Sequence, residues 1–257
     1  MNIKEWGGIS AGSLLALMLG VGYTLKELRT FCEQFDFTHL IDLDDATGWI
    51  LRMGIDTGDS LKRLIEALLK EKGFGPNLTF QELATARPKN PLISIYVTDV
   101  NKGHFVVYSQ KTSPNFKVVD AVRASSAIPI YFQPIIDPTN GHVLVDGGCV
   151  SNLPFLSMTE EERQETIGLN LCKKLEPMDE LDMVDILYRP MVIGMKEQSL
   201  LENAFFKQNI IAIETRITNP LAFNLTQDEK AELLAEGRQA VRKFLAEQRP
   251  PRRWSVS

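Results

Sequence analysis

The stretch Trp6-Gly-Gly-Ile-Ser-Ala-Gly-Ser13 constrains the fold more strongly than any other part of the sequence. It contains the spacing Gly8-x-Ser10-x-Gly12 and is followed by the apolar run 14–21. In a nucleophile elbow, a serine lies in a strained turn between a strand and a helix, and small residues two positions away let the two elements pass closely. Residues 2–7 can form that strand and the apolar run that helix. The stretch therefore predicts a strand–turn–helix unit.

The motif alone leaves two interpretations of Ser10. As a nucleophile, it would lie at a helix N-terminus, where backbone N–H groups favour negative charge. The alternative is a glycine-rich turn in which Ser10 only caps the helix. Deciding between them requires a candidate base elsewhere in the chain, because a serine hydroxyl needs a neighbouring base to become nucleophilic.

Composition excludes several classes of protein. The chain has 257 residues and a net charge of −5, so it has no basic excess for nucleic acid. Its three cysteines, Cys32, Cys149 and Cys172, are odd in number and widely spaced, which indicates neither a disulfide framework nor a zinc site. A reducing, cytoplasmic location is therefore expected. The apolar run 14–21 is far shorter than the roughly 20 residues of a membrane span, although peripheral contact with a membrane stays open.

Periodicity and turn signals predict strands that alternate with helices. Capping-box spacings begin helices at Thr24, Thr79 and Thr226. The other predicted helices cover 59–72, 117–127 and 179–206, and Pro190 can break the last of these; the strands cover 91–98, 104–109, 142–145, 165–171 and 209–215. This alternation predicts a layered α/β fold. We expect one domain over residues 1–248 and a frayed tail over 249–257.

The candidate bases for Ser10 are few. The chain has three histidines, His39, His104 and His142, and none follows position 142 to fill the late position of an α/β-hydrolase triad. His104 and His142 each occupy a predicted strand position, although a triad with either stays conceivable. The remaining candidate is Asp146, which follows a strand and precedes Gly147 and Gly148. Burial there would raise its pKa and make it a better base; the alternative is a turn with local hydrogen bonds.

A second serine motif, Gly58-Asp-Ser-Leu61, resembles the signature of the GDSL lipases. That family requires an Asp-x-x-His near its C-terminus, which this chain lacks. Helix capping by Asp59 or Ser60 explains the stretch without catalysis. Ser60 remains an alternative nucleophile.

The order of the motifs resembles the patatin-like phospholipases over nearly the whole chain. The resemblance is carried by these segments: Gly8–Ser13, Val97–Gly103, Asp120–Pro129, Tyr131–Pro134, Asp146–Gly148, Val150–Pro154 and Glu236–Arg238. It implies a three-layer α/β/α domain with a central, mostly parallel sheet. It also implies a Ser–Asp dyad without histidine, with Ser10 as nucleophile and Asp146 as general base.

The resemblance further implies hydrolysis of lipid esters, either phospholipids or acylglycerols, through an acyl-enzyme and without a metal or cofactor. The Ala11 N–H would supply one oxyanion donor within the elbow formed with Gly8 and Gly12. Gly147 and Gly148 would form the supporting loop beside Asp146. The oligomeric state is not predicted.

The chain departs from the family pattern before the elbow. Family members carry a first strand and a glycine-rich oxyanion loop there, but only nine residues precede Ser10. Loss of one oxyanion donor typically costs about 10²–10³ in rate. Three versions stay open: a fragment of an active hydrolase, an inactive relative that binds lipid or a protein partner, or a sheet completed by another chain.

Three further features have simpler interpretations. Arg123 can contact a phosphate headgroup, but a charge on an exposed helix face is the simpler expectation. Asp99 can orient a loop, although turn chemistry explains it equally well. The methionines at 178, 183, 191 and 195 can line an acyl groove, but helix-spaced core packing is the simpler expectation.

Overall fold

The computed structural model describes residues 3–42, 51, 53–173, 175, 177–215 and 223–248. The strands are β1 (Glu5–Gly8), β2 (Gly54–Asp56), β3 (Leu92–Asp99), β4 (His104–Ser109), β5 (Ile130–Phe132), β6 (Ile135–Ile136), β7 (Val143–Asp146), β8 (Gly168–Lys173) and β9 (Ile210–Thr215). The helices are α1 (Ala11–Val21), α2 (Leu25–Gln34), α4 (Asp59–Glu71), α5 (Phe80–Ala86), α6 (Val118–Ser125), α7 (Glu160–Glu165), α8 (Met183–Phe205) and α9 (Gln227–Glu247). Short 3-10 turns cover Phe37–Leu40, Gly147–Cys149 and Pro154–Ser157.

The central sheet is built around β3 and has mixed strand directions. β1 runs parallel to β3, whereas β4 and β7 run antiparallel to it and β6 extends the sheet beyond β7. Two further parallel pairs, β2 with β5 and β8 with β9, form small separate sheets. The expected α/β class is confirmed, and the sheet contains more antiparallel pairing than the expected mostly parallel arrangement.

Strand register brings two chain segments together at one point. β4 pairs with Ser94–Asp99 along one edge of β3. β1 and β7 pair with residues of the same stretch, so both must lie along the other edge of β3. There Gly8 lies opposite Ile95 and Asp146 lies opposite Val97. Because β1 and β7 run in opposite directions, their C-terminal ends converge beside Tyr96. The separation along β3 is two residues, or roughly 7 Å.

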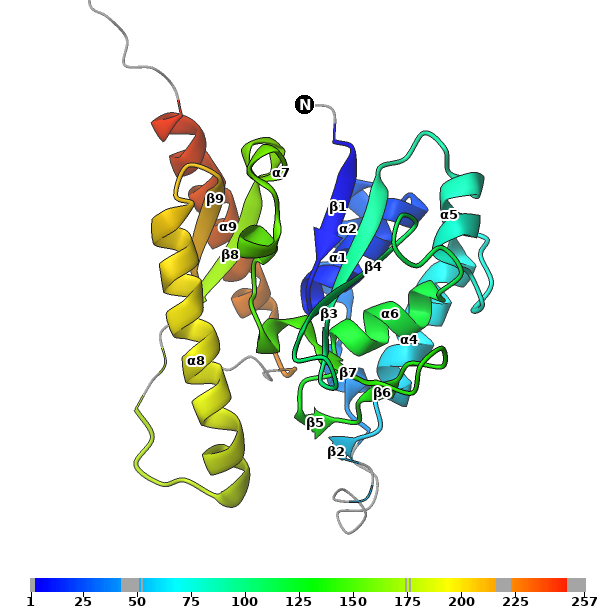
Figure 1. The fold of residues 1–257 in the computed structure, drawn as a ribbon. Coiled ribbons are helices and arrows are strands. Elements are labelled where there is room, and N and C mark those ends of the chain that lie inside the picture. The colour runs from blue at the N-terminus through cyan, green and yellow to red at the C-terminus, as the bar shows by residue number, and fades with distance from the viewer. Residues whose placement is uncertain are drawn as a thin grey trace, which may run out of the picture.

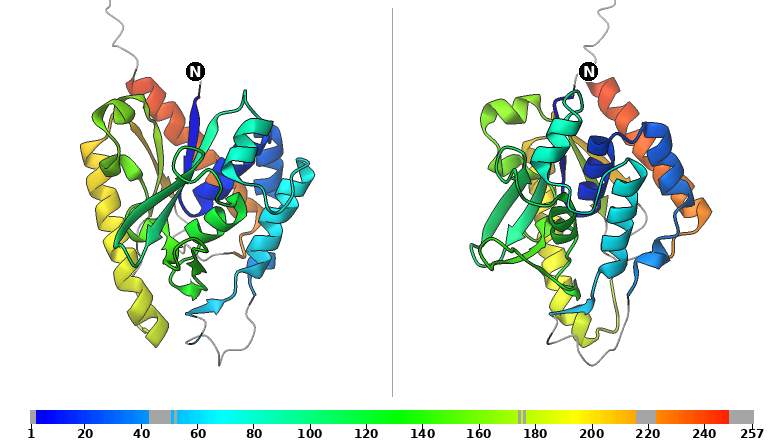
Figure 2. Two further views of the ribbon diagram at one scale, coloured as in Figure 1. Left: turned by 45° about the vertical axis from the view of Figure 1, so that its right-hand side comes forward. Right: turned by 90° about the vertical axis from the view of Figure 1, so that its right-hand side faces the viewer.

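Helices lie on both sides of the strands (Figures 1 and 2). α1, α4 and α6 contact one another, α1 and α6 pack on the central sheet, and β8–β9 lie between α8 and α9. α4 shows why this packing follows from sequence, since its buried residues Leu61, Ile65, Leu68 and Leu69 recur at helical spacing. The main core joins them to residues of α1, β3 and α6.

The strands β1 and β8 each present an open edge. Among the described strands, β1 pairs only with β3, and β8 pairs only with β9. Figure 1 shows β1 and β8 facing each other, and the exposed Lys4 Nζ and Glu165 Oε2 lie 3.0 Å apart near their upper ends.

Capping chemistry fixes most of the predicted helix starts. The capping boxes at Thr24, Thr79 and Thr226 are confirmed, and two that the sequence analysis did not identify begin α7 at Thr159 and α8 at Asp182. The helix α7 occupies the start of the segment predicted as a strand from residue 165. The break expected at Pro190 is absent, because α8 is continuous from Met183 to Phe205 with Pro190 inside it.

The predicted tail over residues 249–257 lies outside the described residues. No helix within the described part of the chain combines the length and the apolar character that crossing a bilayer would require. The single domain expected over residues 1–248 stays a prediction.

Candidate active site

Ser10 occupies a strained turn between β1 and α1. Its backbone angles are φ 51° and ψ −128°, a region that residues other than glycine rarely adopt. Its side chain forms no capping hydrogen bond within the described residues. The geometry is therefore that of an elbow that presents a side chain, and not that of an ordinary helix cap.

The two glycines of the motif differ in their surroundings. A Cβ on Gly8 would lie 2.3 Å from the Gly12 carbonyl oxygen and 2.6 Å from the Ser13 Cα, so only glycine fits there. A Cβ on Gly12 would have no atom of its surroundings within 4 Å. The close strand–helix passage thus depends on Gly8, and the expectation that Gly12 must also be small for this passage is wrong.

Asp146 ends β7 as a buried carboxylate, with 3% of its surface exposed. The Gly148 N–H donates to its Oδ1 at 2.7 Å, whereas Oδ2 has no hydrogen-bond partner among the described residues. Burial raises its pKa to about 6, against the opposing effects of the Ser10 hydroxyl and the Gly148 N–H. The Ser10 hydroxyl is thus near enough to lower the pKa of the carboxylate, although no hydrogen bond of ordinary geometry joins the two side chains.

The C-terminal end of α6 holds both residues in place. The Ser10 N–H donates to Ser125 Oγ at 3.0 Å, and the same hydroxyl donates to the Tyr96 carbonyl at 2.7 Å. The Asp146 N–H donates to the carbonyl of Ala127 at 2.9 Å. Ser125 and Ala127 therefore connect the ends of β1 and β7 to Tyr96 in the middle of β3. Sequence reasoning did not assign this positioning role.

The loop glycines after Asp146 allow close approach. A Cβ on Gly147 would lie 2.5 Å from the Tyr96 carbonyl oxygen and 3.2 Å from a methyl group of Ile9. A Cβ on Gly148 would lie 2.8 Å from the Met195 methyl group. Gly147 excludes a side chain because its neighbour is backbone, whereas the atoms beside Gly148 are the ends of side chains that can shift.

Helix α8 covers this loop with Met191 and Met195, which lie about one turn apart. Met195 contacts Gly148, and the Met191 sulfur lies 3.8 Å from the Cys149 sulfur. Burial and the negative charge of Asp146 raise the pKa of Tyr188 to about 12. The expectation of core packing for the methionines holds for neither Met178 nor Met183, which are 45% and 68% exposed.

The alternative catalytic residues lie in other environments. His142 Nδ1 is 2.8 Å from Asp99 Oδ2, at the opposite end of β7 from Asp146. Asp99 also accepts from the Lys102 N–H, as the turn interpretation predicts. His104 begins β4 and is exposed.

Ser60 donates to Asp42 Oδ1 at 2.6 Å, so it too has a carboxylate partner. Burial alone would raise the pKa of Asp42, but hydrogen bonds from Ser60 and the charge of Arg63 have the larger combined effect. The net pKa of Asp42 is therefore lower than its ordinary value. A carboxylate of lowered pKa is a poorer base than Asp146. Capping by Asp59 or Ser60 is wrong, because the residue that caps α4 is Gly58 in the left-handed region.

Arg123 is a buried structural residue, so the exposed helix-face interpretation is wrong. It is 3% exposed, and its guanidinium donates to the carbonyl groups of Thr57, Gly58 and Gln133. Burial lowers its pKa to about 10. These bonds join α6 to the turn before α4.

A buried carboxyl group connects α8 to the loop after Asp146. Ser151 Oγ lies 2.7 and 2.8 Å from the two carboxyl oxygens of Glu202 and 2.5 Å from the Leu153 carbonyl oxygen. A hydroxyl has one proton to donate, so it cannot satisfy all three of these close oxygens by itself. Burial raises the pKa of Glu202, against the opposing effect of the Ser151 hydroxyl.

We therefore expect the native chain to lose stability as pH rises, and the Glu202→Gln variant to lose less. Because the folded-state pKa is raised, the native stability contribution is full at low pH and declines through the window above the unfolded pKa. Urea unfolding from pH 4.5 to 8.5 measures this difference. Glu229→Gln is the control, because hydrogen bonds from Thr226 lower the pKa of Glu229, so its contribution changes only below this window and the variant should follow the native pH dependence. A difference between Glu202→Gln and the native chain that does not change with pH would contradict a raised pKa of Glu202.

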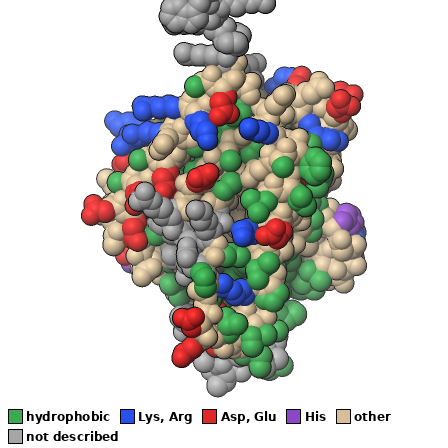
Figure 3. All heavy atoms as spheres, turned by 90° about the vertical axis from the view of Figure 1, so that its left-hand side faces the viewer, with side chains coloured by type: hydrophobic (Ala, Val, Ile, Leu, Met, Phe, Trp, Pro, Cys, Tyr) green, Lys and Arg blue, Asp and Glu red, His purple; other side chains and the backbone are tan. Residues whose placement is uncertain are grey.

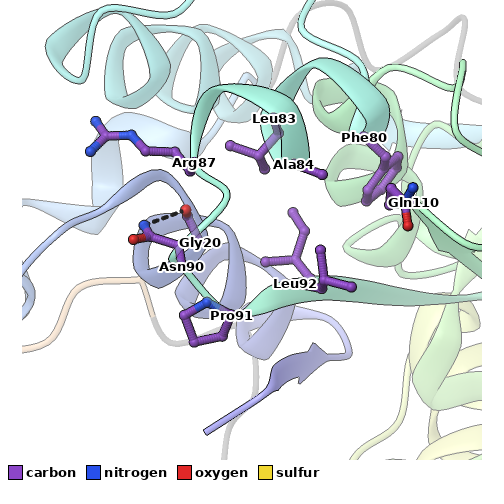
Figure 4. Close-up of a pocket in the computed structure, with 10 residues that line it drawn as sticks. Gly20, Phe80, Leu83, Ala84, Arg87, Asn90, Pro91, Leu92 and Gln110 are labelled. Carbon is purple, nitrogen blue, oxygen red and sulfur yellow. Dashed lines mark hydrogen bonds between the residues drawn. The ribbon is translucent and has the colours of Figure 1, made fainter.

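A small pocket lies away from Ser10 and Asp146, between α1, α5 and β3 (Figure 4). Its volume of about 10 Å³ is roughly what a single water molecule requires. Asn90 closes one side by donating to the Gly20 carbonyl at 3.1 Å. It is too small for an organic substrate.

Comparison with known proteins decides the family. The sequence model of the patatin-like phospholipase family matches residues 1–159, more than half of the chain. The chain belongs to this family. Patatin-like family membership confirms the resemblance on which Ser10 and Asp146 were selected.

Relatives and solved structures agree with this membership. The chain is 27% identical to the uncharacterized protein YqhO of Bacillus subtilis, over 95% of this chain and 88% of that protein. It is 26% identical to the probable lipid hydrolase 463L of Invertebrate iridescent virus 6, over 60% of this chain and 52% of that protein. The fold is similar to VipD from Legionella pneumophila, with a TM-score of 0.66 at 17% identity, covering 96% of this chain and 61% of VipD.

Proposed function

We propose that this patatin-like protein is a serine acyl hydrolase that cleaves lipid esters with Ser10 and Asp146. One observation carries the proposal: a strained serine converges with a buried carboxylate whose pKa is raised to about 6. A base of this pKa is ionised at neutral pH and still accepts a proton readily. Family membership and the relative named as a probable lipid hydrolase support the substrate class.

The proposed chemistry has two half-reactions. Asp146 takes the Ser10 proton as Oγ attacks the acyl carbonyl carbon, and the tetrahedral oxygen becomes negative. As the ester bond breaks, protonated Asp146 gives its proton to the leaving alcohol, and the acyl group stays on Ser10. Asp146 then deprotonates a water that attacks the acyl-enzyme, and the fatty acid leaves as Oγ regains a proton.

The start of α1 supplies part of the oxyanion stabilisation. The N–H groups of Gly12 and Ser13 bond to the carbonyl groups of Ile9 and Ser10. Ala11 is the first helical residue, and an N–H at that position has no intrahelical partner. It therefore remains free to bind the developing oxyanion, with support from the positive end of the helix dipole.

We expect a fluorophosphonate probe to label Ser10. The probe reacts with an activated serine hydroxyl, so Ser10→Ala should remove the label completely and lower ester turnover at least about 10³-fold. Mass spectrometry of the labelled peptide and turnover of a soluble short-chain ester measure the two effects. Ser60→Ala is the matched control, because Ser60 also donates to a carboxylate and belongs to the alternative Gly-Asp-Ser-Leu motif.

Two outcomes would contradict this assignment. Label on Ser60 with turnover that survives Ser10→Ala would place the chemistry at the Gly-Asp-Ser-Leu motif. Folded protein with neither label nor turnover would instead indicate a patatin-like protein that binds lipid or a protein partner without catalysis.

A further inference from the structure

The helix α8 exposes an unusual number of large apolar side chains. Seven large apolar side chains on it are between 44% and 76% exposed: Met183, Ile186, Leu187, Ile193, Leu200, Leu201 and Phe205. We call these residues the outer face of α8. Figure 3 views the side of the molecule on which α8 lies and shows hydrophobic side chains gathered over the right half of that face. A helix normally exposes its polar side, so this face is suited to contact with an apolar partner.

The opposite side of the same helix lies over the candidate active site. Met191 and Met195 lie about one turn apart and approach Cys149 and Gly148 respectively. A single helix therefore has one apolar side against the loop of the proposed base and another apolar side against solvent.

The charges of α8 balance one another. Asp185 and Glu197 are acidic and Arg189 and Lys196 are basic, while the remaining acid, Glu202, is buried against Ser151. Lys196 Nζ lies 3.7 Å from Glu197 Oε1. Helical geometry places only Glu197 of these within the outer face. Binding through this face would therefore depend on apolar contact and not on attraction to anionic lipid.

From this arrangement we infer that the outer face of α8 docks the protein on a lipid surface. The inference rests on the proposed function, because a water-insoluble ester must pass from an aggregate to Ser10. A helix with such a face lies in the membrane interface with its apolar side chains inserted among the acyl chains. The contact would hold α8 against the lipid layer, with the loop of Asp146 on the other side of the helix.

Vesicle binding by an inert protein tests the docking independently of turnover. Ser10→Ala protein should co-sediment with phosphatidylcholine vesicles, equally at 0.1 M and about 0.5 M salt. Adding Ile186→Ser and Ile193→Ser should weaken this binding about tenfold or more. Leu25→Ser is the matched control, because Leu25 on α2 is 77% exposed and lies outside the outer face. Thermal unfolding of each variant checks that the fold is retained.

A second variant reports the insertion of α8 into the lipid directly and does not rely on weakened binding. Tryptophan at position 186, introduced by Ile186→Trp, should shift its emission to shorter wavelength when vesicles are added, whereas Leu25→Trp should not. Three results would overturn the inference: no vesicle binding, binding that requires anionic lipid and disappears with salt, or a dimer in solution that Ile186→Ser with Ile193→Ser dissociates. Binding without fluorophosphonate label would support the docking surface and remove the hydrolase proposal. Fluorophosphonate label without vesicle binding would support the hydrolase proposal and remove the docking surface.

Discussion

Asp146→Asn should lower ester turnover by about 10²–10⁴ and at the same time make the protein more stable at pH 7 to 8. The loss of rate follows because an amide cannot accept the Ser10 proton. The gain in stability follows because burial raises the pKa of Asp146 from an ordinary 3.8 to about 6, so the folded chain holds an unfavourable buried charge at neutral pH. At 1.36 kcal/mol per pKa unit, removing that charge should stabilise by up to about 3 kcal/mol.

The pH dependence of both effects follows from the same raised pKa. Between about pH 4 and 6 the folded chain binds more protons at Asp146 than the unfolded chain does, so native stability falls as pH rises through this window. Activity moves in the opposite direction, because the base must be ionised, and kcat/KM should rise with pH to a plateau above about 6. In Asp146→Asn both slopes attributable to this group should disappear.

Thermal unfolding and turnover of a soluble ester from pH 4 to 8 measure these effects. Asp137→Asn is the matched control, since Asp137 is equally buried at 3% exposure. Although burial raises its pKa, hydrogen bonds from Thr139 and Tyr108 outweigh burial and lower it. That control should destabilise at neutral pH. If Asp146→Asn instead destabilised the protein as Asp137→Asn does, Asp146 would be a structural carboxylate.

Local sequence signals were sufficient where neighbouring residues determine the structure. The strand–turn–helix at Ser10, the three capping boxes and the strand that ends at Asp146 all depend on residues a few positions apart. Family resemblance then paired Ser10 with Asp146, which the strand register brings to neighbouring positions along β3. No spacing in the sequence could give that register, because it depends on which edge of β3 each strand occupies.

Tertiary contacts determine the features that sequence reasoning missed. Arg123 resembles a surface charge because its helix neighbours do not reveal that the carbonyl groups of a distant turn surround it. Ser125 gains its role only when the turn after β1 and the middle of β3 approach it. The exposure of one side of α8 was equally hidden, since an apolar helix normally indicates burial.

Gly8→Ala should destabilise the protein by about 3 kcal/mol or more and remove activity, whereas Gly12→Ala should stabilise it by about 0.4–1 kcal/mol. The new methyl group at position 8 would lie 2.3 Å from a backbone carbonyl oxygen of α1, so no side-chain rotation can relieve the clash and strand and helix must separate. The methyl group at position 12 would enter open space, and alanine favours the helical conformation that Gly12 already adopts. Urea unfolding of the two variants measures the difference directly. Equal destabilisation by both would show that the elbow tolerates neither side chain and that Gly8 has no special steric role.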